Sequence, residues 1–267
     1  SSLEEGWRRI REKIRISKPS IAGRYLGCQH HFSHNEKGGT TEYEVTQFMK
    51  QCCLRYLEVS GLPKEALTSA STPFLPDEAF SDEDENEEGS LREDSSKVLM
   101  KILYGARVAR YDLLNPTRAL AGCTHKWTRA CDKKLHRLVC YINSTVDLTL
   151  KGYINDKPED LYLRLYADAD FAGCKKTARS TSGVFLCLCG PNSWFPIAAT
   201  SKRQGCVSHS TPEAELVAVD LAIRAEGLPA LIIFENIFGR PVKLVFEEDN
   251  QAAISVMKSG YSPALKH

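Results

Sequence analysis

The sequence predicts an α/β protein whose C-terminal part is a mixed β-sheet flanked by helices, preceded by a more helical region. Two observations carry this prediction. Before residue 159 the apolar residues recur mainly at helical spacing, and from Leu161 onward their period changes to two. The 267 residues, 42% of them apolar, are also enough to give two domains a core each.

Residues 1–76 combine both patterns and are expected to form a small α+β module. Residues 7–16 are amphipathic, residues 24–39 read as a strand pair with its turn, and residues 44–59 show helical spacing. The Pro-rich stretch 71–76 ends the module.

Residues 77–95 form an acidic segment. From 77 to 94 there are ten acidic residues and one base, Arg92, with little apolar content. Such a stretch buries too little apolar surface to fold by itself, so the sequence predicts a solvated linker.

Residues 96–158 form an α-rich basic segment. Between 95 and 158 there are twelve Lys and Arg residues and four Asp and Glu residues, a net charge of +8, whereas the whole chain carries +1. Helices are predicted at 96–109 and 127–142, and the bases of the second lie largely opposite its apolar side. This segment is a candidate surface for a polyanion; the open alternative is that its bases only solubilise the helices.

Residues 159–267 carry strand patterns, with helical patterns between them. Strands are predicted at residues 161–173, 181–189, 206–209 and 242–246. The Gly-Leu-Pro run at 227–229 interrupts the helical pattern, which predicts a kink or two helices.

Acidic residues gather at two strand ends and one helix start. Asp168 and Asp170 share one face of the first strand, and periodicity cannot choose between them. A Ser-x-x-Glu capping box at 210–213 places Glu215 in the first helical turn, where an acid can also serve only the helix dipole. Asp249 follows the last strand. Carboxylates are the ligands Mg²⁺ prefers, so these acids are candidates for metal-dependent phosphodiester hydrolysis.

YADADFAG at residues 166–173 is the first of several motifs that occur in a fixed order. The others are RSTSG at 179–183, SW at 193–194, SKRQ at 201–204, STPEAE at 210–215 and DNQAAI at 249–254. Together they resemble the ribonuclease H domain of copia-type retrotransposons, where the first segment reads YSDADWAG.

The upstream sequence resembles the same family. Residues 102–112 and 134–150 are similar to its connection region, and residues 24–28 and 71–73 to the thumb end of its reverse transcriptase. The resemblance spans residues 7–267. It implies the following division: a thumb-like reverse transcriptase remnant (1–76), an acidic linker (77–95), a basic connection (96–158), and a ribonuclease H-like domain without its C-terminal end (159–267). The implied sheet has five strands.

The resemblance also implies which acids bind metal. These are Asp168, Glu215 and Asp249, with Asp170 and Glu213 as neighbours. In the family a fourth carboxylate follows a Lys-His-Ile segment, whereas this sequence ends at residues 266–267 with Lys-His. The expected cofactor is therefore Mg²⁺ in a two-metal site whose second ion lacks that ligand.

The expected substrate is an RNA–DNA hybrid, bound through its phosphates in a largely sequence-independent way. The residues expected to contact it are Lys133, Lys134 and Arg137 in the connection and Lys202, Arg203 and Gln204 near the site.

The implied function is cleavage of the RNA strand of RNA–DNA hybrids during reverse transcription. The polymerase's own aspartate motif, expected before Trp7, does not occur in this sequence, so the upstream polymerase portion of the same polyprotein or a separate subunit is the expected partner. The alternative from another class is a catalytically inactive or domesticated descendant that acts as a nucleic-acid-binding or structural subunit.

No apolar run approaches the ~18 to 20 residues that cross a bilayer, and no signal peptide is evident, so we expect a soluble intracellular protein without membrane partners. The compartment implied by the resemblance is a cytoplasmic virus-like particle or the nucleus. The ten cysteines are scattered, which favours reduced thiols. Cys28 with His30, His31 and His34 is a weak zinc candidate because no CxxC partner exists.

Overall fold

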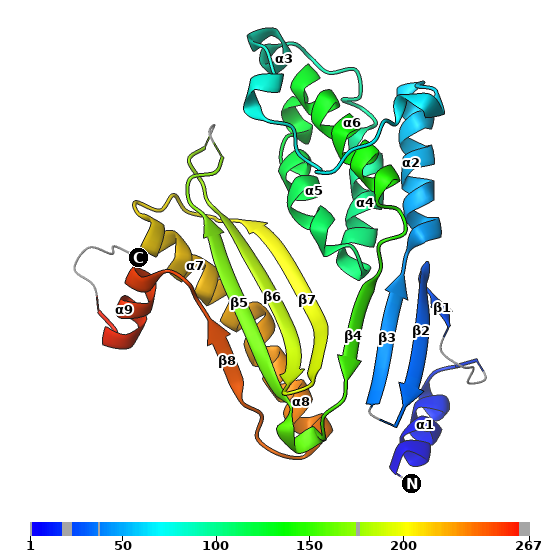
Figure 1. Ribbon diagram of the computed structural model, residues 1–267, viewed down its shortest axis with the longest axis vertical. Coiled ribbons are helices and arrows are strands. Elements are labelled where there is room, and N and C mark those ends of the chain that lie inside the picture. The colour runs from blue at the N-terminus through cyan, green and yellow to red at the C-terminus, as the bar shows by residue number, and fades with distance from the viewer. Residues whose placement is uncertain (1, 18–22, 37, 175–176, 262–267) are drawn as a thin grey trace.

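A computed structural model describes residues 2–17, 23–36, 38–174 and 177–261. Within these residues it contains one eight-stranded sheet in the order β1-β2-β3-β4-β7-β6-β5-β8, flanked by helices (Figure 1). Only β5 and β8 pair in parallel; the other pairs are antiparallel. The predicted fold class is confirmed: the chain is mixed α/β, consistent with a ribonuclease H-like fold.

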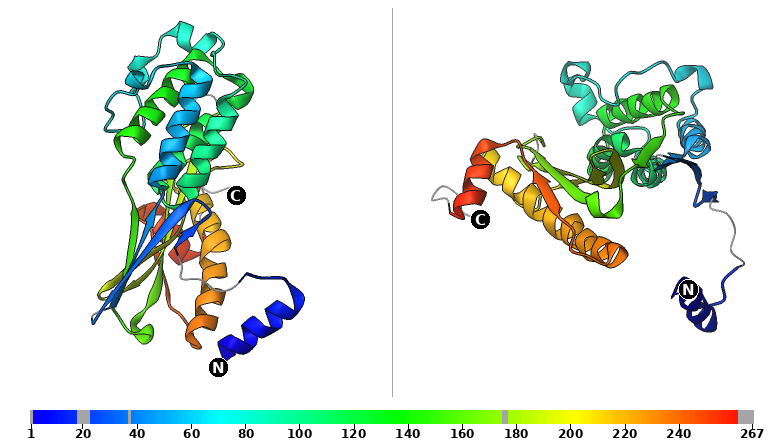
Figure 2. Two further views of the ribbon diagram at one scale, coloured as in Figure 1. Left: turned by 90° about the vertical axis from the view of Figure 1, so that its right-hand side faces the viewer. Right: turned by 60° about the horizontal axis from the view of Figure 1, so that its bottom comes forward.

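The described strands are β1 (Arg24–Tyr25), β2 (Cys28–Asn35), β3 (Gly38–Glu44), β4 (Leu150–Ile154), β5 (Tyr162–Asp170), β6 (Thr181–Gly190), β7 (Ser193–Arg203) and β8 (Leu244–Glu247). The α-helices are α1 (Ser2–Lys13), α2 (Thr46–Ser60), α3 (Asp82–Asn86), α4 (Ser95–Val108), α5 (Leu114–Ala121), α6 (Arg129–Ser144), α7 (Thr211–Ala222), α8 (Leu228–Phe238) and α9 (Gln251–Ser259). Helix α1 lies apart from the sheet and from the other helices (Figure 2). None of the described helices is long and apolar enough to cross a bilayer.

The sheet differs from the expected five strands because β1–β4, which belong to the upstream segments, join it through a bridge between Tyr153 and Trp194. The prediction of a short strand at 206–209 is wrong: the third strand is β7, and residues 206–209 form an irregular segment with bends. Pro196 weakens the strand pattern of β7, and the register shift opposite Leu186 and Cys187 accommodates it.

The upper helical layer in Figure 1 has one core, to which both upstream segments contribute. Met49 and Tyr56 of α2 lie in it together with Ile102 of α4 and Leu138 of α6, each at most 2% exposed. The predicted modules 1–76 and 96–158 thus share one core, while their boundaries stay a prediction.

The acidic segment is ordered, contrary to the expected solvated linker. Ser81 caps α3 in a reciprocal capping box with Asp84, which is buried and pairs with Lys133 of α6 at 2.5 Å. An isolated bridge joins Glu88 to Thr128 at the start of α6. Contacts with α6, a basic helix far away in the sequence, therefore stabilise this segment, whose own apolar content is too low to do so.

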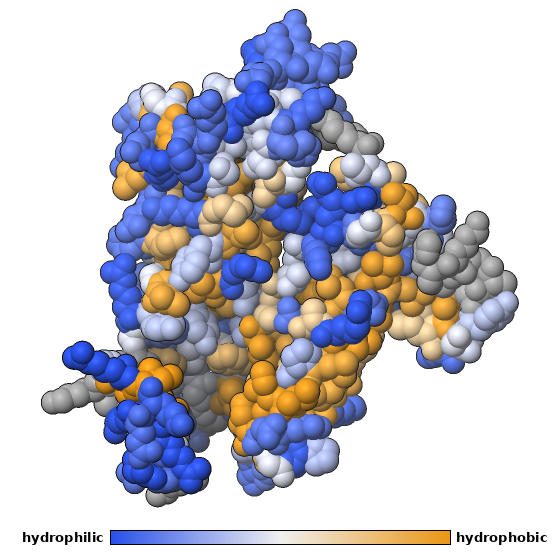
Figure 3. Space-filling model, turned by 180° about the vertical axis from the view of Figure 1, so that it is seen from behind, coloured by the Kyte–Doolittle hydropathy of each residue, from blue (hydrophilic) through white to orange (hydrophobic). Residues whose placement is uncertain are grey.

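A second core lies between strands β5–β8 and helices α7 and α8. The interruption predicted at 227–229 is confirmed: a π-helical stretch, Ile223–Gly227, separates α7 from α8. Gly227 sits where a Cβ would meet the Leu165 side chain at 3.0 Å, so its lack of a side chain allows the close approach to the sheet. The outer side of α8 is apolar and exposed at Leu228, Ile232, Ile233 and Ile237, in the orange area of Figure 3.

Candidate metal-binding active site

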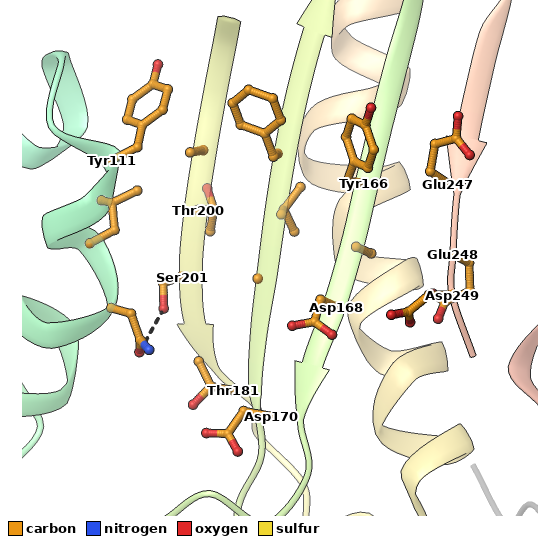
Figure 4. A pocket seen from close by; sticks show the side chains of 17 residues that line it. Tyr111, Tyr166, Asp168, Asp170, Thr181, Thr200, Ser201, Glu247, Glu248 and Asp249 are labelled. Atoms are coloured by element: carbon orange, nitrogen blue, oxygen red, sulfur yellow. Dashed lines mark hydrogen bonds between the residues drawn. The ribbon is translucent and has the colours of Figure 1, made fainter. Parts of the chain in front are cut away.

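A groove of about 620 Å³ crosses the face of the sheet opposite α7 (Figure 4). It runs from Tyr111, Leu114 and Asn115, next to and in α5, across β7, β6 and β5 to the end of β8. Acids line it at two strand ends, namely Asp168, Asp170, Glu247, Glu248 and Asp249.

Strand β5 presents its acids to this groove because its residues alternate between the two faces. Leu163 and Leu165 are fully buried under α7, whereas Tyr166, Asp168 and Asp170 point to the other side. Both candidate aspartates therefore share the face that periodicity predicted.

The two aspartates have different surroundings. Asp170 pairs with Thr181 of the neighbouring strand β6. Its carboxylate packs against Gly173, and a Cβ atom at position 173 would collide with that carboxylate. Asp168 lies two residues earlier, at the level of Asp249, which follows the neighbouring strand β8 (Figure 4). The parallel register of β5 and β8 explains why the two aspartates lie at the same level: Tyr166 pairs with Glu247, and each aspartate lies two residues after one member of that pair.

Helix α7 contributes two buried glutamates with different roles. Ser210 caps the helix and accepts a hydrogen bond from the Glu213 backbone N–H. The Glu213 carboxylate accepts a hydrogen bond of 2.6 Å from the His209 backbone N–H, so it holds the turn before the helix. Glu215 is 4% exposed, and its buried Oε2 has no hydrogen-bond partner.

The environment of Glu215 shows that the acids converge. The pKa of Glu215 is raised from 4.5 to about 7, most of all by burial and then by the charges of Glu248, Asp168 and Asp249, in that order. A hydrogen bond from the backbone of Ala169 acts in the opposite direction. Asp168, Glu215 and Asp249, from β5, α7 and the loop after β8, thus lie near enough for their charges to interact.

Glu248 belongs to the same place, and the sequence motifs did not single it out. Burial raises its pKa, as do the charges of Asp249 and Asp168, while the Asn250 backbone lowers it. The only sequence signal is its position directly before Asp249, which a solvated strand end would also produce.

The carboxylates of Asp168, Glu215, Glu248 and Asp249 fit a hard divalent cation, which prefers oxygen ligands. Glu215 Oε2 is in addition a buried acceptor that no hydrogen-bond donor satisfies. Among the residues with described positions, no three Asp, Glu, His or Cys side chains are already grouped closely enough to hold a metal ion. Asp168 and Asp249 are exposed, so a change of rotamer is open to them.

The predicted phosphate contacts of the connection are occupied by protein groups. Lys133 pairs with Asp84, Lys134 lies 3.9 Å from Glu85, and Arg137 donates to the Thr72 carbonyl at 2.8 Å.

The second predicted set lies at the end of β7, and its three members have different surroundings. Lys202 is exposed, and Arg203 lies against Gly122, just after α5. Gln204 is 4% exposed, and its amide donates to Ser182 Oγ and to the Ala214 carbonyl. The structure therefore places Gln204 inside the protein as a link between β6 and α7, away from any surface contact.

Arg118 of α5 is a further basic residue here that the motifs did not indicate. Burial lowers the pKa of its guanidinium, and the charge of Arg203 lowers it further. Its terminal nitrogen donates to Asn115 Oδ1 at 3.0 Å, and Asn115 lines the groove. Two like charges thus stand together beside the groove.

No known protein-family model matches this chain. An uncharacterized mitochondrial protein of Arabidopsis thaliana is 35% identical to it over 115 residues, which are 43% of this chain and 45% of that protein. The match thus spans less than half the length of this relative. Because the relative is itself uncharacterized, the chemistry of the site has to carry the functional argument.

Proposed function

We propose that the chain is a retrotransposon-derived ribonuclease H that cleaves the RNA strand of RNA–DNA hybrids with the help of Mg²⁺. The observation that carries the proposal is the environment of Glu215: a buried carboxylate with an orphaned oxygen, faced by the charges of Asp168 and Asp249. A folded protein that concentrates acids in this way has to offset their repulsion, and a bound cation does so.

The three acids would hold the cation from three separate elements. Asp168 comes from β5, Glu215 from the first turns of α7 and Asp249 from the loop after β8. Bound Mg²⁺ would supply a nucleophilic water and stabilise the leaving 3′ oxygen. Glu213, which hydrogen-bonds the His209 backbone, fixes the start of α7 and thereby the position of Glu215.

The groove and its bases support a polyanionic substrate. Arg118 donates to Asn115, which lines the α5 side of the groove, and Arg203 is its charged neighbour. The acids of the groove lie on β5 and at the end of β8. A phosphate between the two guanidiniums would relieve their repulsion and could direct a strand across the sheet toward the acids. We infer backbone recognition, which does not depend on base sequence.

The resemblance of the motifs to copia-type elements adds the biological setting to this proposal. The chain would act next to the polymerase portion of the same polyprotein, or a separate polymerase subunit, in a virus-like particle or in the nucleus. These partners and locations are inferences from the motif order in residues 7–267.

The test is a cleavage assay on an end-labelled RNA–DNA hybrid, with the chain that carries residues 1–267, in Mg²⁺ and in EDTA. We expect Mg²⁺-dependent cuts in the RNA strand, and we expect Asp249→Asn to remove them while hybrid binding is retained. Asp160→Asn, an exposed site at the other end of β5, is the matched control and should cleave normally. Binding without cleavage would refute the nuclease and support the inactive, nucleic-acid-binding alternative.

A further inference from the structure

Glu248 brings a fourth carboxylate to the site from the turn between β8 and α9. Along β8, Leu244 and Phe246 pair with Leu163 and Leu165, the residues of β5 that face α7. Strand β8 ends at Glu247, and Glu248 and Asp249 follow it in the turn before α9, where both line the groove. Both acids also lie near Glu215 of α7, because their charges act on its carboxylate.

The two oxygens of Glu248 have different partners. Oε1 accepts a hydrogen bond of 3.1 Å from the Asn250 backbone N–H, which helps to shape the turn before α9. Oε2 is buried and has no hydrogen-bond partner, as is also true of Glu215 Oε2. Of the charged neighbours of Glu215, Glu248 raises its pKa the most. Glu215 is buried and Glu248 is half-buried, and each has a buried oxygen without a hydrogen-bond partner. Two such carboxylates on adjoining elements are unfavourable unless a cation joins them.

We propose that Glu248 is a ligand of the metal site, binding a hard divalent cation through Oε2 together with Glu215, Asp168 and Asp249. The inference rests on the proposed function, since it assigns a further ligand to the same site. It gives the chain a fourth carboxylate from within residues 244–259, independent of any acid that follows residue 267 in related sequences.

The test is metal binding, measured without substrate. Mg²⁺ and Mn²⁺ are titrated into the wild-type chain, Glu248→Gln, Glu215→Gln and Glu247→Gln by calorimetry, and each protein is melted in EDTA and in Mg²⁺. Glutamine keeps the Oε1 acceptor for Asn250 and removes the charge, so Glu248→Gln retains the turn. Glu247→Gln is the matched control, because its carboxylate lies one residue away and pairs with Arg164.

We expect Glu248→Gln to weaken metal affinity roughly tenfold or more and to reduce the metal-induced rise in Tm. In EDTA the same variant should melt at a higher temperature than the wild-type chain, because one like charge is gone. Glu247→Gln should bind metal within about twofold of wild type, as expected for a charge outside the coordination sphere.

Two results would overturn the inference, and they differ in what they mean for the proposed function. If Glu215→Gln loses metal binding and Glu248→Gln retains wild-type affinity, Glu248 only shapes the turn, and the proposed function stands. If the wild-type chain binds neither Mg²⁺ nor Mn²⁺ at millimolar concentration, the proposed function fails and the inference fails with it.

Discussion

Lys133 Nζ of α6 lies 2.5 Å from Oδ2 of Asp84, in the acidic segment 49 positions earlier in the chain. Asp84 is buried and is also held by Ser81, so this contact fixes α3 against α6. The bases that gave the middle segment its positive charge are therefore partly neutralised inside the same molecule.

Removing this internal counter-charge should strengthen the binding of polyanions. We expect Asp84→Asn combined with Glu85→Gln to free Lys133 and Lys134, and to steepen the dependence of log K on log salt by about one to two units for a hybrid. Fluorescence anisotropy with a labelled hybrid at several salt concentrations measures the slope. Asp82→Asn with Glu83→Gln removes the same charge from exposed positions and serves as the control. Equal slopes for both double variants would contradict the expectation.

The same pair predicts how stability depends on pH. The hydrogen bond from Lys133, together with those from Ser81, lowers the pKa of Asp84 from 3.8 to about 2 in the folded protein. A lowered pKa means that the charged form is favoured by folding, so its stabilising effect is full above pH 3.8 and is lost as the pH falls toward 2. The difference in unfolding free energy between wild type and Asp84→Asn should be constant at neutral pH and shrink across that window. A difference that persists at pH 2 would contradict the assignment.

Arg110 should be the charged residue whose loss harms the upper core most. It is 1% exposed and binds Asp112 through two nitrogens, at 2.9 and 2.7 Å, and the Thr145 carbonyl at the end of α6 at 2.9 Å. Arg110→Ala removes these hydrogen bonds and leaves Asp112 only the one from the Tyr141 hydroxyl, so we expect a loss of roughly 3 kcal/mol or more in the free energy of unfolding. Urea denaturation measures it, with Arg107→Ala, an exposed residue near the end of the preceding helix α4, as the control.

The sequence was sufficient for those elements whose pattern is local. The period-two run of β5 and the amphipathic helices α2, α4 and α6 are confirmed, because burial on one side dictates their spacing. Strand β7 was missed because Pro196 breaks its pattern, and a register shift in the sheet is what tolerates it. The order of the acidic segment depends on α6, which no local pattern could reveal.

The same distinction between local patterns and contacts with distant elements applies to the residues of the site. Alternation placed Asp168 and Asp170 on one face, and only the packing of Asp170 against Gly173 separates them. No sequence motif indicates Glu248 or Arg118, because each interacts with a charged residue on another element, Glu215 and Arg203 respectively. Gln204 was placed at the surface by its position in a basic motif, whereas its amide is satisfied inside.

Arg118 and Arg203 should govern hybrid affinity without supporting the fold. Burial and the charge of Arg203 lower the pKa of Arg118, so the two like charges repel each other in the free protein. We expect Arg118→Ala and Arg203→Ala each to weaken binding to hybrids of unrelated sequence to a similar degree, and to reduce the salt slope by about one. Because repulsion is relieved, neither variant should melt at a lower temperature than wild type by more than a few degrees. Arg224→Ala, an exposed base in the π-helical stretch, controls for the lost charge and should leave both affinity and slope unchanged. If all three variants weaken binding equally, the groove has no dedicated phosphate contact, and the attraction is that of general surface charge.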